Sequence, residues 1–175
     1  GLLLRCESLE RSVQVLKAEG NWTYSAPDVP RSHWIEQGHD EEYADVADNL
    51  IQSIKANTQS LRSDGDGAKV DVECVTPILS DDDLFPHWEQ LANAIQLRER
   101  IEALSLCNVQ LDARTLQMIE ASVRQKDIAT FGLTGNSFHG GEGEKFAIDV
   151  LKSNKKITRF GWVGNNFHSM GDACT

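Results

Sequence analysis

The chain has 175 residues, of which 40% are hydrophobic and 25% charged, as is typical of a globular domain. No apolar run approaches the roughly 20 residues that a membrane span needs, so we expect no transmembrane protein and no membrane partner. The 27 acidic and 17 basic residues give a formal net charge of −10, which argues against nucleic acid as a partner.

The first predicted element is a helix over residues 2–20. Apolar residues recur there at alternating steps of four and three, which is typical of an amphipathic helix with a coiled-coil-like seam. They are Leu2, Cys6, Leu9, Val13 and Leu16. We expect this helix to cap the rest of the domain; pairing with a partner protein is the alternative.

Residues 21–40 carry aromatic residues and prolines without any period. We expect Trp22, Tyr24 and Trp34 to fold back over a core rather than to form an exposed binding patch. Residues 1–42 are therefore predicted to be an N-terminal amphipathic helix followed by an aromatic linker.

From residue 43 onward, helical and strand-like patterns alternate. Apolar stripes with helical spacing cover 43–54, 88–95, 116–123 and 146–151. Strand-like segments follow them, and three of these align with one another from Ile101, Ile128 and Ile157, at repeat lengths of 27 and 29 residues. Each has apolar residues at relative positions 1, 4, 6 and 11.

A weaker fourth copy runs from Val72 through Cys74, an inward-facing position, to Leu79. One strand–helix unit cannot bury its apolar face alone, whereas stacked units share a continuous core. The pattern therefore predicts an α/β chain with a curved parallel sheet, built from strand–helix repeats of about 28 residues.

Two asparagines occupy the same position in their copies. Asn136 and Asn165 lie two residues before Phe138 and Phe167. We expect their side chains to hydrogen-bond the backbone of the turn that leaves each strand. Pro77 and Val109 stand at this position in the first two copies.

The motifs Leu104-x-Leu106, Phe131-x-Leu133-x-x-Asn136-x-Phe138 and Phe160-x-Trp162-x-x-Asn165-x-Phe167 resemble leucine-rich repeats of the ribonuclease-inhibitor type. The helix-to-strand junction at 150–162 is similar to repeats of the tropomodulin and leiomodin family. This resemblance covers residues 43–175. It implies a leucine-rich-repeat solenoid with an N-terminal helical cap, and a cytoskeletal partner such as actin.

In such an architecture, the strand residues between the inward-facing ones line the concave face. The predicted partner-binding residues are Glu73, Ser105, Cys107, Gly132, Thr134, Arg159, Gly161 and Val163, with Val75 beside them. Most are small and uncharged, so another backbone or helix can approach closely. We therefore expect a non-catalytic module that binds a protein through this face. The alternative is a recognition or regulatory segment of a larger enzyme, effector or regulator of small GTPases.

No motif indicates an enzyme, a metal site or a cofactor. The sequence Asp64-Gly-Asp66 begins like an EF-hand loop, but Ala68 stands where a third ligand is needed. His139 and His168 are repeat-equivalent and have no third ligand, so copying of the repeat explains them better than a metal site. The glycines near 132–143 lack the Lys-Ser/Thr of a P-loop.

The four cysteines are scattered, without any Cys-x-x-Cys pair. This favours a reducing, cytoplasmic location over a disulfide-stabilised fold, although Asn21-Trp22-Thr23 matches a glycosylation sequon. Cys107 is expected to face outward. Because Gly1 is not a natural start, we expect the chain to be a fragment of something longer. Because the last copy ends before its helix, we expect the repeat domain of 43–175 to be truncated at its C-terminal end.

Overall fold

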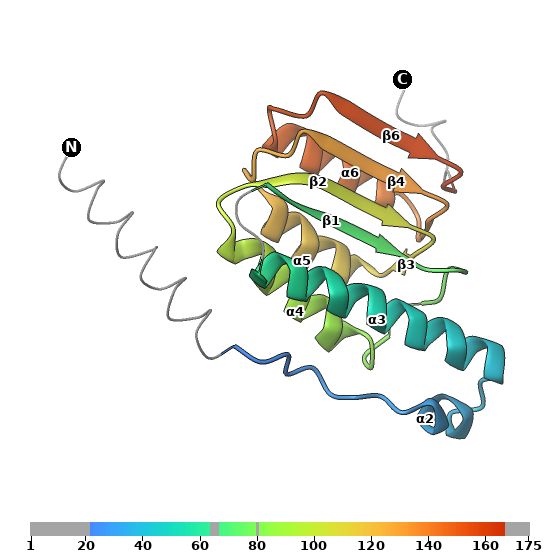
Figure 1. Cartoon of the computed structure of the whole chain (residues 1–175). Coiled ribbons are helices and arrows are strands. Elements are labelled where there is room, and N and C mark those ends of the chain that lie inside the picture. Colours follow the sequence, from blue (N-terminus) through green and yellow to red (C-terminus); the bar gives the residue numbers. More distant parts are fainter. Residues whose placement is uncertain (1–21, 64–66, 80, 167–175) are drawn as a thin grey trace.

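The computed structural model describes residues 22–63, 67–79 and 81–166. The chain is an α/β protein with a four-stranded parallel sheet (Figure 1). The strands follow one another in chain order across the sheet: β1 (Ala68–Glu73), β2 (Ile101–Cys107), β4 (Thr130–Thr134) and β6 (Arg159–Val163). The short strands β3 (Gln110–Leu111) and β5 (Ser137–Phe138) form a second parallel pair. The predicted α/β class is confirmed.

The long helices cover one face of the sheet, and no described residue covers the other (Figure 1). The helices are α2 (Arg31–Glu36), α3 (Glu41–Ser63), α4 (Phe85–Leu97), α5 (Ala113–Val123) and α6 (Glu142–Ser153). The predicted stripes are confirmed, since Leu50, Trp88, Ile119 and Val150 are all buried. The predicted helix over 2–20 lies outside the described residues.

The strand register aligns the apolar side chains of successive strands. Leu104 pairs with Phe131 and Phe131 with Phe160, so these three residues form one column across the sheet. Leu104 and Phe131 are fully buried, whereas Phe160, on the outer strand, is 45% exposed. The core therefore runs from α3 to α6 and becomes accessible at β6.

The prediction for the first copy is wrong by two residues. Val70, not Val72, pairs with Leu104. Val70, Val72 and Cys74 alternate with polar residues, and a shift of two keeps the same face buried, so alternation alone cannot select the register. Cys74 is buried as expected but lies just beyond the strand.

The end of that copy also differs from the prediction. Ile78 takes the buried position, and Leu79, predicted to face inward, is 51% exposed. Leu79 instead forms an isolated parallel bridge with Gln110.

Helix α3 lies against the outer edge of β1 and satisfies its free backbone groups. The Asn57 side chain accepts a hydrogen bond from the Asp71 amide and donates one to the Asp71 carbonyl, both at 2.7 Å. Ser53 Oγ accepts a hydrogen bond from the Glu73 amide at 3.1 Å. An edge strand that is capped in this way cannot pair with another strand at these groups.

The aromatic linker folds back on the helices, as predicted. Trp34 is fully buried and packs edge-on against Tyr43. The Tyr24 hydroxyl lies 2.7 Å from His87 Nδ1 on α4, and Lys55 on α3 lies over the Tyr24 ring. Residues of the linker thus tie α3 to α4 from outside.

The two asparagines do hydrogen-bond turn backbone, but in the turn of the preceding strand rather than in their own turn, where the sequence predicts the contacts. Asn136 Oδ1 accepts a hydrogen bond from the Val109 amide, and Asn136 Nδ2 donates to the Leu106 carbonyl, both at 2.9 Å. Asn165 makes the same pair of bonds one strand later. Its Oδ1 accepts a hydrogen bond from the Asn136 amide, and its Nδ2 donates to the Leu133 carbonyl, both at 2.8 Å. Each asparagine therefore joins its own turn to the turn of the preceding strand.

Candidate functional site

The uncovered face of the sheet, here called the open face, presents side chains in three rows that run across the four strands. The register defines the rows as Lys69–Ala103–Thr130–Arg159, Asp71–Ser105–Gly132–Gly161 and Glu73–Cys107–Thr134–Val163. All twelve residues are at least partly exposed. Parallel pairing fixes their spacing, because neighbouring strands lie about 4.8 Å apart.

The structure places all eight predicted residues on the open face. Val75, predicted to lie beside them, is beyond the end of β1 and outside the rows. Four further residues share the face: Lys69, Asp71, Ala103 and Thr130. The two-residue shift in β1 explains why the first two are absent from the prediction. Ala103 and Thr130 share the first row with Arg159, which the sequence does predict.

The centre of the open face is shallow because two neighbouring positions have no side chain. A Cβ atom added to Gly132 would meet only Ser105 Oγ, at 4.0 Å, and one added to Gly161 would meet nothing within 4 Å. Neither glycine has a positive φ angle. These glycines therefore leave a trough over β4 and β6 without being required by the backbone.

Charges lie at the two edges of the open face. Asp71 and Glu73 lie on β1, and Arg159 lies on β6. Lys69 is directed to Glu102, with Nζ 3.9 Å from a carboxylate oxygen. The open face is therefore acidic at one edge and basic at the other, with small neutral residues between.

The acidic edge affects the pKa of the Cys107 thiol. Its pKa is raised, first by partial burial and then by the negative charges of Glu73 and Asp71. Cys107 and Cys74 are both free thiols. A raised pKa keeps Cys107 protonated and weakly nucleophilic at neutral pH.

We expect the Glu73→Gln variant to alkylate faster at Cys107 than the parent at pH 8. Removing the negative charge lowers the thiol pKa and increases the thiolate fraction at that pH. The measurement is the rate of iodoacetamide labelling at Cys107, followed by mass spectrometry of the peptide that contains it. The Asp48→Asn variant, changed on an exposed part of α3, is the control and should keep the parent rate. An unchanged or slower rate in Glu73→Gln would contradict the assigned cause.

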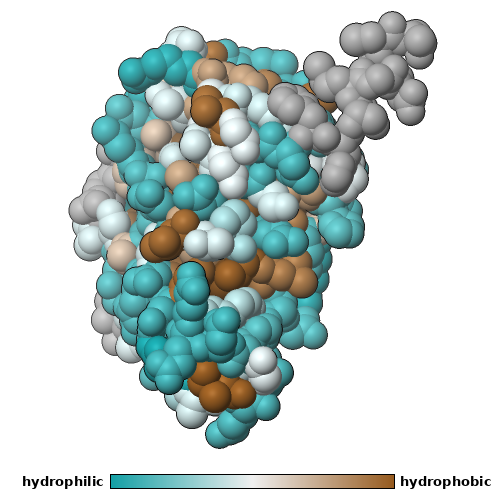
Figure 2. Space-filling model, turned by 90° about the vertical axis from the view of Figure 1, so that its right-hand side faces the viewer, coloured by the Kyte–Doolittle hydropathy of each residue, from teal (hydrophilic) through white to brown (hydrophobic). Residues whose placement is uncertain are grey.

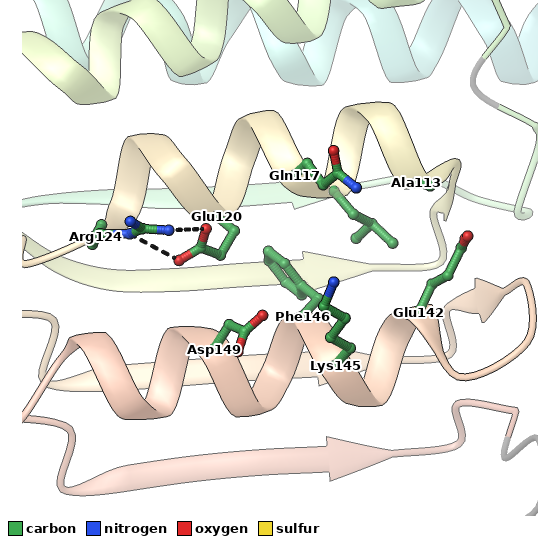
Figure 3. A pocket seen from close by; sticks show the side chains of 9 residues that line it. Ala113, Gln117, Glu120, Arg124, Glu142, Lys145, Phe146 and Asp149 are labelled. Carbon is green, nitrogen blue, oxygen red and sulfur yellow. Dashed lines mark hydrogen bonds and ion pairs between the residues drawn. The ribbon is translucent and has the colours of Figure 1, made fainter.

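A second hollow, of about 310 Å³, lies between α5 and α6 on the helical side (Figure 3). Leu116 and Phe146 form its apolar floor. Arg124 holds the Glu120 carboxylate through two hydrogen bonds, at 2.8 and 3.2 Å. Figure 3 shows the Lys145 amine directed toward the gap between the helices. The lining contains no Ser, Cys or His, so this hollow offers charge but no side-chain nucleophile of these types.

The remaining candidates do not come together. Within the described ranges, no group of three or more His, Cys, Asp or Glu residues could hold a metal ion. His139 is described, whereas its equivalent His168 and the loop from Asp64 to Asp66 lie outside the described residues. No described helix is long and apolar enough to cross a membrane.

Comparison with known proteins gives no match, either to a family model, to a curated protein or to a solved structure.

Proposed function

We propose that this chain is a non-catalytic protein-interaction module that binds a partner protein through the open face of its sheet. The observation that carries the proposal is the arrangement of that face: its side chains are small at the centre and charged at two edges, and no described residue covers it. A partner's backbone can approach Gly132 and Gly161 closely, and the flanking charges can fix its orientation.

We also propose that the fold is a leucine-rich-repeat solenoid of the ribonuclease-inhibitor type. Three features support this. Parallel strands follow one another in chain order, and a helix on the same face connects each to the next. Equivalent strand residues recur after 27 and 29 residues. The buried asparagines join consecutive turns. Repeat proteins of this kind commonly use the exposed sheet face to bind other proteins.

The resemblance to tropomodulin and leiomodin repeats makes actin the first partner to test, and a small GTPase the second. Binding of nucleic acid is not expected, because the net charge is −10. We propose a cytoplasmic location, which the free thiols of Cys74 and Cys107 support.

The test uses the whole chain and the Gly132→Arg/Gly161→Arg variant. A Cβ atom at either position meets no other atom closer than 4.0 Å, so the variant should fold while its arginines fill the trough. The control is Gly141→Arg/Gln52→Arg, which also adds two arginines. Gly141 has open space around it, and neither control position belongs to the open face.

Binding to purified actin, to purified small GTPases and to proteins retained from a cell lysate is measured for all three chains, with circular dichroism as the check on folding. We expect a partner to be retained by the parent and the control and lost, by tenfold or more in affinity, in the Gly132→Arg/Gly161→Arg variant. Equal retention by all three chains would contradict binding through the open face.

A further inference from the structure

A groove lies where the sheet strands end, away from the open face. It consists of two adjoining hollows of about 550 and 290 Å³ that share Leu79 and Gln110 in their linings. It extends from the turn between α2 and α3, past residues 76–79, to the starts of α5 and α6. Figure 2 faces this side of the molecule and shows a hydrophobic band across its middle. We call it the strand-end groove.

The strand-end groove has an apolar centre. Leu79 is 51% exposed at the junction of the two hollows, and its isolated bridge to Gln110 fixes the backbone there. Leu111 and Ile78 line the groove beneath it and are buried. An exposed leucine above a buried apolar floor is a place where another apolar side chain can displace water.

One wall of the groove is held in place by contacts among its own residues. The rings of His39 and Tyr43 stack with their centroids 3.8 Å apart and their planes at 8°. Asp40 Oδ1 accepts a hydrogen bond from the Tyr43 amide at 2.8 Å, so this carboxylate is held at the start of α3. Because these side chains are already ordered, less conformational entropy is lost when a ligand binds.

The charges that line the groove are of one sign. Asp40 and Glu42 lie in the first hollow, Asp112 and Glu142 lie in the second, and neither lining includes Lys or Arg. The negative field extends beyond these residues: the pKa of Tyr43 is raised, first by burial and then by Asp81 and Asp83. The nearby cation Arg114 lies against the Phe85 ring and 3.5 Å from Asp82.

We propose that the strand-end groove binds a short peptide segment of a partner protein in which an apolar side chain is flanked by lysine or arginine. The apolar side chain contacts Leu79, and the basic residues on either side reach the carboxylates of the two hollows. An acidic ligand is repelled by these carboxylates, and a second copy of this chain carries the same net charge of −10. The groove is a surface separate from the open face, so its test does not depend on the function proposed above.

The probe is a fluorescein-labelled peptide with a central Leu-Trp pair and two lysines on each side. Its binding to the whole chain is measured by fluorescence anisotropy at two salt concentrations. One control peptide has glutamate in place of each lysine, and another has serine in place of Leu-Trp. We expect measurable binding of the first peptide only, with a Kd below about 1 mM and weaker binding at higher salt.

Two pairs of variants test the location. Leu79→Glu is matched with Ile148→Glu, because Ile148 is 48% exposed and lies on α6 outside the groove lining. Glu42→Lys is matched with Asp48→Lys on the same helix. We expect Leu79→Glu to weaken binding about tenfold and Glu42→Lys severalfold, the latter with a smaller salt dependence, while each control keeps the parent affinity. Failure of the parent to bind the first peptide, or equal affinities within each pair, would overturn the proposal.

Discussion

The Phe131→Ala variant is expected to lose about 3–5 kcal/mol of unfolding free energy. Phe131 lies on β4, is fully buried and packs against one ring from the helix layer and one from the neighbouring strand. Its centroid is 6.0 Å from that of Phe146 on α6 and 5.4 Å from that of Phe160 on β6. Truncation removes these contacts and leaves a cavity that a parallel sheet under a helix layer cannot close. Urea denaturation followed by circular dichroism measures the loss.

Phe160→Ala is the matched control for this prediction. It removes the same side chain from the next strand, in the same register column. Because Phe160 is 45% exposed, much of its surface already contacts water, and we expect a loss below about 2 kcal/mol. Equal losses in the two variants would show that β4 is not the centre of the core.

The Asn136→Ala variant is expected to lose about 2–4 kcal/mol. It leaves the Val109 amide and the Leu106 carbonyl without their side-chain partner, in a part of the core where Val109 and Leu106 are both buried. A buried backbone group without a partner costs about 1–3 kcal/mol, and here two are affected.

Asn136→Asp separates the two bonds, because an aspartate keeps the acceptor for Val109 and loses the donor to Leu106. We expect it to be destabilised as well, since a carboxylate oxygen would then face the Leu106 carbonyl. The control is Asn49→Ala, at an exposed asparagine that donates only to the Asp45 carbonyl within its own helix. It should change stability by less than about 0.5 kcal/mol. A loss in Asn136→Ala no larger than in the control would contradict the structural role of these asparagines.

Local patterns in the sequence predict most of the fold. The change between periods of 2 and 3.6 locates helices and strands, and the spacing of 27 and 29 residues aligns β2, β4 and β6 correctly. That Asn136 and Asn165 hydrogen-bond turn backbone also follows from their equivalent positions. These features depend on residues that are close in sequence or on repetition of one pattern, so one chain is sufficient to find them.

The errors come from places where local pattern leaves several solutions. The alternation Val70, Val72, Cys74 fits two registers equally well, so the sequence misses Asp71 on the open face. Leu79 is misplaced for another reason: nine residues separate Val70 from Leu79, whereas six separate their partners Leu104 and Gln110. The strand-end groove could not be predicted either. Its walls combine the α2–α3 turn, the segment after β1 and the starts of α5 and α6. These segments are far apart in the sequence, and only tertiary packing brings them together.

The two proposed surfaces differ in chemistry. The open face is small and neutral at its centre, which suits the close approach of a partner backbone. The strand-end groove is apolar and acidic, which suits a basic and apolar side-chain pattern. A chain that carries both could bind two segments of one partner, or two partners, at the same time.

Protection of Cys107 is the most direct measurement of binding at the open face. Cys107 lies in the third row, between Glu73 and Thr134, and its labelling rate in the free chain is the reference. Buried Cys74 serves as an internal standard, because its labelling requires opening of the core. With a saturating amount of the partner that the capture experiment identifies, we predict slower labelling of Cys107 and no change at Cys74. An unchanged Cys107 rate in the saturated complex would contradict the account.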